Sequence, residues 1–236
     1  MLKSIIKPAL IALSMSVAAA GAWAADGAAL LRKVDDIRAP GANFTFDLTL
    51  NSGGKTEQLE VSVQNSTKGL VRYTKPTKMA GRSILFVDKN MWVFVPGTRR
   101  ALRISPQQRV LGGVSSADVA RTVYSSDYKV VSTSGSGNAI VLQLAPKTKS
   151  AAYARIDLTV ASSGAPKQAV FYAGGGRKLK TMHFGGYKSV LGASRPTQLK
   201  VVDHLEGGKV TTMTYSSFKK AKTPAAWYQP NNLNRL

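Results

Sequence analysis

The sequence predicts a mainly β protein of the α+β class, with one large curved antiparallel sheet of about 11 strands, an N-terminal helix and a second helix embedded among the strands. Three observations support this prediction. Apolar and polar residues alternate with a period of two along most of the chain after residue 42. The alternating segments are joined by short turn sequences, which only antiparallel neighbours allow. Helical periodicity is confined to two short segments, so parallel βαβ architectures are excluded.

The first residues have the pattern of a secretory signal peptide. Two lysines precede an apolar run over 8–21, and Ala22 and Ala24 place small residues at positions −3 and −1 of a cleavage site. The run is shorter than the roughly 20 residues that a membrane span needs. We therefore expect a cleaved signal peptide over 1–24, export to the periplasm, and a single domain over 25–236.

The charge balance is strongly basic. The chain has 33 Lys and Arg against 12 Asp and Glu, a formal charge of +21, and removal of the two signal lysines leaves +19. For an exported protein the available anions are lipid head groups and acidic protein surfaces, and we expect an anionic membrane surface as a partner and no nucleic acid. Solvated cations that protect sheet edges are the alternative explanation. The candidate cations form two groups, Arg99, Arg100, Arg103 and Arg109 near one hairpin, and Arg177, Lys178 and Lys180 near another.

A helix of about 13 residues is predicted from Asp26, ending before Pro40. Its apolar residues lie at helical spacing on one face: Leu30, Leu31, Val34 and Ile37. The period then changes to two. The alternating segments are 44–50, 59–63, 70–74, 83–87, 91–95, 101–105, 128–133, 139–144, 152–160, 167–173, 178–184, 197–202 and 209–215.

One interruption differs from the turns. Gly112 and Gly113 are followed by Ser115 and, three residues later, by Asp118, which resembles a capping box. The pattern predicts a short helix that opens at this capping box and runs through 119–123, preceded by a flexible pair of glycines.

The predicted sheet has more apolar surface than two short helices cover. About 11 strands at ~4.8 Å spacing give a width of roughly 50 Å, whereas each helix is ~10 Å across. The remaining face could close as a barrel, pack as a sandwich or stay open as a groove that holds an apolar ligand.

Catalytic chemistry has little support. The chain has no Cys and two His, which leaves no thiolate nucleophile and no Cys-based zinc site. Asp203 and His204 are neighbours on a predicted strand, so their side chains point to opposite faces and do not form a triad. Gly174, Gly175 and Gly176 lack the Lys and helix of a phosphate loop. We expect no enzyme activity, no metal and no cofactor.

The segment from Lys75 to Tyr128 resembles the LolA-like outer-membrane lipoprotein-sorting family, in an uncharacterised and more basic branch. The resemblance rests on Pro76, Gly81–Asp88, the hairpin sequence Met91–Pro96 and the basic run Thr98–Ser105, and on the order of helix, strands, embedded helix and further strands. It implies an incomplete, half-barrel sheet whose concave apolar face receives acyl chains beneath a lid. The implied groove lining is Phe44, Phe46, Leu48, Leu85, Val87, Trp92 and Phe94. The implied lid residues are Leu111, Gly112, Gly113, Val114, Val119 and Val123.

The function expected from this resemblance is that of a periplasmic carrier or chaperone, which binds the acyl chains of a lipoprotein or lipid and delivers them toward the outer membrane. Such a carrier needs an inner-membrane transporter as donor and an outer-membrane acceptor. The alternative is a lipid-binding sensor of the same fold that signals to a protein partner. A neighbouring gene for a membrane exporter would favour transport, and one for an anti-sigma factor would favour sensing.

Overall fold

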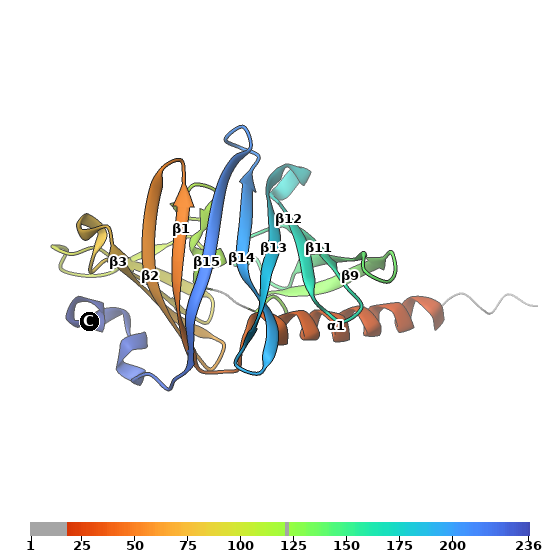
Figure 1. Ribbon diagram of the computed structural model, residues 1–236, viewed down its shortest axis with the longest axis horizontal. Coiled ribbons are helices and arrows are strands. Elements are labelled where there is room, and N and C mark those ends of the chain that lie inside the picture. Colours follow the sequence, from red (N-terminus) through yellow and green to blue (C-terminus); the bar gives the residue numbers. More distant parts are fainter. Residues whose placement is uncertain (1–17, 121–122) are drawn as a thin grey trace, which may run out of the picture.

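The computed structural model describes residues 18–120 and 123–236, with side chains described over 26–119 and 123–236 (Figure 1). Residues 1–17 of the predicted signal peptide therefore lie outside the described residues, as do residues 121–122 of the predicted lid helix.

A single antiparallel sheet of 13 strands dominates the fold, in the order β6-β5-β4-β3-β2-β1-β15-β14-β13-β12-β11-β10-β9. The pairing of β1 with β15 joins its two halves. The sheet is strongly curved (Figure 1), and its end strands β6 and β9 do not pair, so it is not closed into a barrel. The strands are β1 (Phe44–Ser52), β2 (Lys55–Gln64), β3 (Lys68–Lys75), β4 (Ser83–Val87), β5 (Asn90–Phe94), β6 (Leu102–Ile104), β9 (Tyr128–Ser134), β10 (Ile140–Pro146), β11 (Arg155–Val160), β12 (Pro166–Tyr172), β13 (Lys178–Val190), β14 (Ala193–Asp203) and β15 (Lys209–Lys220).

The predicted fold class and curved open sheet are confirmed. In β1 the residues at every second position, from Phe44 to Leu50, are buried, as the alternation predicts. The sheet has 13 strands rather than about 11, because each alternating segment forms a strand of its own, including the three residues of β6.

Helix α1 (Ala18–Arg38) lies along one end of the sheet, against β9 and β14 (Figure 1). Leu31 and Val34 are buried, as the spacing predicts. The helix is longer than expected because residues 18–25 are rich in alanine, the best helix former. Within the described residues, no helix combines the length and the apolar character needed to cross a membrane.

The embedded helix is α2 (Ser116–Ala120), which follows the small hairpin of β7 (Arg109–Leu111) and β8 (Val114–Ser115). The predicted capping box is confirmed. The Ser115 N–H donates to Asp118 Oδ2 at 2.7 Å, and the Asp118 N–H approaches Ser115 Oγ at 3.4 Å. The helix begins directly after the cap residue Ser115, as the capping box predicts.

Two hydrophobic clusters lie on opposite faces of the sheet. The larger lies on the concave face and includes residues of both α-helices and of strands along the whole sheet. The smaller lies on the outer face over β3, β4 and β5, where Tyr228 and Leu233 pack against Leu70, Leu85 and Phe94. These two covering residues belong to the C-terminal 3-10 helices η3 (Ala225–Tyr228) and η4 (Pro230–Arg235); two further 3-10 turns are η1 (Thr77–Met79) and η2 (Gly174–Gly176).

Gly112 is held by close packing and is not a free hinge. It has φ +52°, and a Cβ there would lie 2.2 Å from Thr211 Oγ1 and 2.6 Å from Ser52 Oγ. We expect Gly112→Ala to cost about 1–2 kcal/mol for its left-handed backbone and a further 1–3 kcal/mol for overpacking, measured by denaturant unfolding. Gly54→Ala is the matched control, since Gly54 has φ +76° in open space. Equal losses in the two variants would contradict the packing role.

Candidate functional site: a lidded concave face

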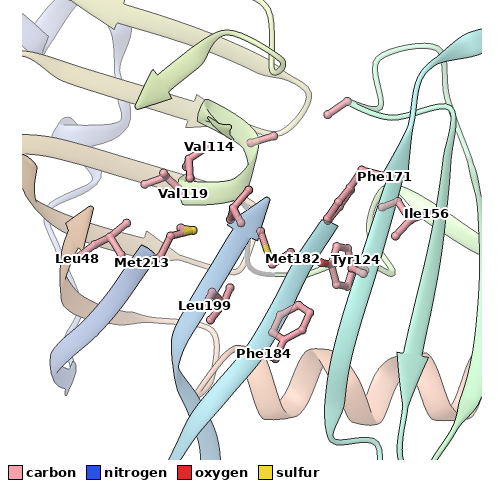
Figure 2. Close-up of a cluster of buried hydrophobic side chains, with 14 of the residues drawn as sticks. Leu48, Val114, Val119, Tyr124, Ile156, Phe171, Met182, Phe184, Leu199 and Met213 are labelled. Atoms are coloured by element: carbon pink, nitrogen blue, oxygen red, sulfur yellow. The ribbon is translucent and has the colours of Figure 1, made fainter. Parts of the chain in front are cut away.

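The concave face, defined by the buried side chains of Phe44, Phe46, Leu48 and Leu50, is covered at its centre by one short segment. We call the described part of residues 111–125 the lid. Val114 and Val119 of the lid are 0% and 1% exposed and belong to the same cluster as Leu48 and Met213 (Figure 2). Helix α2 contacts β2, β3 and β4, so the lid lies inside the curve of the sheet.

A buried ion pair fixes the lid to β13. The Asp118 carboxylate contacts the Lys180 ammonium, and their side chains are 3% and 5% exposed. Lys180 Nζ also donates to the Gly113 carbonyl at 3.2 Å. Burial lowers the pKa of Lys180, and the Asp118 carboxylate opposes this shift by favouring the ammonium. Two charges this far from water need further hydrogen bonds to offset their lost hydration.

Asp118 obtains those bonds from Ser115 and Tyr153. The Ser115 hydroxyl donates to Asp118 Oδ2 at 2.9 Å, and the Tyr153 hydroxyl donates to Oδ1 at 3.0 Å. Burial raises the pKa of Tyr153 well above its ordinary value, so this phenol stays protonated as a donor. We call Ser115, Asp118, Tyr153 and Lys180 the latch.

The last turn of α1 holds the other end of the lid. Asp35, which is 6% exposed, accepts hydrogen bonds from the Tyr124 N–H at 2.6 Å and the Ser125 N–H at 2.9 Å. Burial raises the pKa of Asp35, although these hydrogen bonds partly offset the shift. The Arg38 guanidinium stacks over the Tyr124 ring at 4.1 Å. The lid is therefore attached to the sheet at one end and to α1 at the other.

The concave face contains two cavities of about 30 Å³ each. One lies beside the lid and is lined by residues that include Val123, Ile156 and Met182, whereas Phe46 and Phe184 help to line the other. A volume of this size holds one or two water molecules at most. Neither of these two cavities has room for an acyl chain while the lid is in this position, which we call the closed state.

The residues expected to line one groove are divided between the two faces. Phe44, Phe46 and Leu48 lie on the concave face. The other four, Leu85, Val87, Trp92 and Phe94, belong to the outer cluster beneath η3 and η4. Their neighbours on β4 and β5, including Ile84, Phe86, Met91 and Val93, face the concave side instead. The difference arises because both faces of β4 and β5 are apolar and covered.

The expected lid residues do lie together. Val114 and Val119 are buried, Leu111 packs against the concave cluster, and Val123 lines a cavity. Gly112 and Gly113 lie in close contact with the sheet. A Cβ on Gly113 would lie 3.0 Å from Asp203 Cβ.

The expected basic surface needs correction at Lys180, which is 4% exposed because it forms the latch with Asp118. Arg109 forms an ion pair with buried Asp203 at 2.9 Å and also contacts Glu206. Arg103 donates to the side chain of Asn90. The remaining predicted cations are exposed: Arg99, Arg100, Arg177 and Lys178.

Neighbouring Asp203 and His204 have different partners. Asp203 pairs with Arg109, while His204 Nε2 lies 2.9 Å from Thr181 Oγ1. Within the described residues, no group of three or more His, Cys, Asp or Glu side chains is arranged to hold a metal ion.

Comparison with known proteins supports the fold assignment. A family model described as "Uncharacterized protein" matches residues 65–235. The structure is similar to a LolA superfamily protein from Nitrosomonas europaea, with a TM-score of 0.78 and 27% identity over 85% of this chain and 96% of that one. It also resembles a DUF1329 family protein from Desulfovibrio piger, with a TM-score of 0.71 and 18% identity over 89% and 99% of the two chains. An outer membrane lipoprotein-sorting protein domain from Vibrio parahaemolyticus has a TM-score of 0.66 and 19% identity over 90% and 97%. No curated protein matches the sequence.

Proposed function

Since a family model matches residues 65–235 and the structure is similar to that of a LolA superfamily protein, we propose that the chain is a periplasmic carrier of the LolA-like outer-membrane lipoprotein-sorting family, which binds acyl chains on its concave face and delivers them toward the outer membrane. The proposal rests on the way in which the lid covers the concave face. An apolar face is covered by a five-residue helix that is fixed by a few buried polar contacts. A helix this short has no stability of its own, so its position depends on those contacts.

The energetics favour exchange of the lid for a ligand. An acyl chain with about 14 methylenes gains roughly 11 kcal/mol on burial, at ~0.8 kcal/mol per CH₂. Exposing Val114 and Val119 again costs about 3–6 kcal/mol. Burial of the chain therefore outweighs the burial of these two valines, and the other apolar contacts of the lid, the latch and Asp35 set the remaining cost of opening. No covalent step is required, and the cargo leaves when an acceptor offers it an equally apolar site.

The proposal is tested by identifying what the protein carries. The protein is purified from its own periplasm, extracted with organic solvent, and the extract is examined by mass spectrometry. We expect a stoichiometric acyl species, and a fluorescent fatty-acid probe should bind the delipidated protein and be displaced by that extract. A protein that yields no acyl species and binds no probe would contradict the carrier function.

Electrostatic attraction should bring the carrier to anionic membranes. We expect binding to vesicles that contain phosphatidylglycerol, weakening between 50 and 500 mM salt as charges are screened, with less binding to phosphatidylcholine alone. The double variant Arg99→Ser/Arg100→Ser should bind more weakly in a sedimentation assay. Lys219→Ser/Lys220→Ser is the matched control because it removes the same charge from exposed positions on β15. Equal binding to both vesicle types would contradict this prediction.

Export should remove the signal peptide after Ala24. Small residues occupy both position −3 and position −1 there, so the mature chain is expected to begin at Ala25. The intact mass of protein isolated from the periplasm measures this directly. Ala24→Arg, which places a large charged side chain at position −1, should leave precursor uncleaved. A periplasmic form that retains Met1 would be incompatible with the prediction.

A further inference from the structure

Arg38 places a cation on the apolar concave face. It is the last residue of α1, four residues after buried Val34 and on the same side of the helix. Its guanidinium lies over the ring of Tyr124 at 4.1 Å and within 5.8 Å of the centre of the Phe184 ring. The two cavities of the concave face share Arg38 as a lining residue.

The Nη1 group of Arg38 is buried and has no hydrogen-bond acceptor among the described residues. A buried donor without an acceptor is costly, and an aromatic ring compensates the charge of a guanidinium without accepting its in-plane N–H bonds. Arg195, the other cation that lines these cavities, differs in this respect. Its Nη1 donates to the carbonyls of Asp36 and Ile37, and its Nε donates to that of Val190 at 3.1 Å. Of these two arginines, Arg38 is therefore the one whose Nη1 group is available to donate a hydrogen bond to a ligand.

The charges around the cavities favour a neutral acceptor over an anion. Among the described residues, the cations here already have carboxylates beside them: Asp35 lies near Arg38, and Asp118 contacts Lys180. An added anion would leave one uncompensated charge in a region with little water, whereas a carbonyl oxygen would not.

We propose that Arg38 Nη1 donates a hydrogen bond to the ester carbonyl oxygen of a bound acyl chain and so fixes the polar end of that chain on the concave face. This inference rests on the proposed carrier function. Arg38 belongs to α1, whereas Tyr124 belongs to the lid. Movement of the lid takes the ring away from the guanidinium, and the ester carbonyl replaces that interaction when the chain enters. The preferred cargo is accordingly an ester-linked acyl lipid, and its alkyl segments lie along the apolar walls that include Phe46 and Phe218.

The test compares two ligands with the same chain length, methyl laurate and dodecyl methyl ether, which differ in the carbonyl. Each competes with a fluorescent fatty-acid probe for the delipidated full-length mature protein. A hydrogen bond to a charged donor predicts that the ester binds at least about tenfold more tightly than the ether. Arg38→Met should abolish that preference and leave the affinity for the ether nearly unchanged. Arg32→Met, at an exposed position on the same helix, should preserve the preference.

The outcomes separate this inference from the carrier function. Equal binding of ester and ether to the unaltered protein overturns the role of Arg38 and leaves the carrier function intact; this comparison does not depend on how any variant folds. Binding of neither ligand overturns both. Lauric acid binding much more tightly than its methyl ester, with the difference lost in Arg38→Met, overturns the preference for a neutral ester.

Discussion

Replacing Lys180 with Met is expected to lower the free energy of unfolding by about 3–5 kcal/mol. The substitution keeps a side chain of similar length but leaves the Asp118 carboxylate buried without its cation. The hydrogen bonds from Ser115 and Tyr153 remain, yet they do not supply a full charge. Urea unfolding followed by circular dichroism measures the loss.

Lys178→Met is the matched control, because Lys178 lies two residues earlier on β13 and is exposed. Its effect should stay within about 0.5 kcal/mol. The double variant Lys180→Met/Asp118→Asn should recover part of the loss, since it leaves no unpaired carboxylate. A Lys180→Met protein as stable as the original would show that the latch contributes nothing to closure.

The strands were predictable because they carry a local signal. In β1, apolar and polar residues alternate over the whole strand, and the 13 segments with such alternation each form a strand. The start of α2 was predictable for a similar reason, since Ser115 and Asp118 have capping-box spacing and make the corresponding contacts. Both features depend on residues that are close in sequence.

The assignment of faces depends on contacts between distant residues. Trp92 and Phe94 lie two apart and share a face, but the alternation does not say which face is concave. The side chains of Trp92 and Phe94 lie on the outer face because Tyr228 and Leu233 cover them there. These two residues are more than 100 positions further along the chain. For the same reason the groove lining could be predicted only in part.

The buried charged residues could have been recognised from their positions in the periodic patterns, which a search for clusters of charge does not consider. Lys180 lies two residues before Met182 and four before Phe184 on β13. Residues at this spacing share one face of a strand, so the period of two already places the Lys180 side chain on the core face. Asp35 lies four residues after Leu31 on one face of α1, and Arg38 four after Val34. In this chain, a polar residue at an apolar position of a periodic pattern indicates a buried polar contact better than a local concentration of charge does.

Val119→Asp is expected to open the lid. Val119 is 1% exposed, and the substitution loses about 1.5–3 kcal/mol of apolar burial in addition to the penalty for a carboxylate with no partner in an apolar cluster. The closed state should lose more stability than any open state, in which residue 119 reaches water. A fluorescent fatty-acid probe should then enter faster in stopped-flow experiments, while circular dichroism reports an intact sheet.

Two internal controls separate opening of the lid from general unfolding. Trp92 and Trp227 both belong to the outer cluster, so the tryptophan emission of the mature chain should not change when the lid moves. Val131→Asp introduces the same charge at a valine that is 51% exposed on β9, and it should alter neither stability nor probe entry. Unchanged probe kinetics in Val119→Asp with an intact fold would mean that α2 is only a structural element and that ligands reach the concave face by another route.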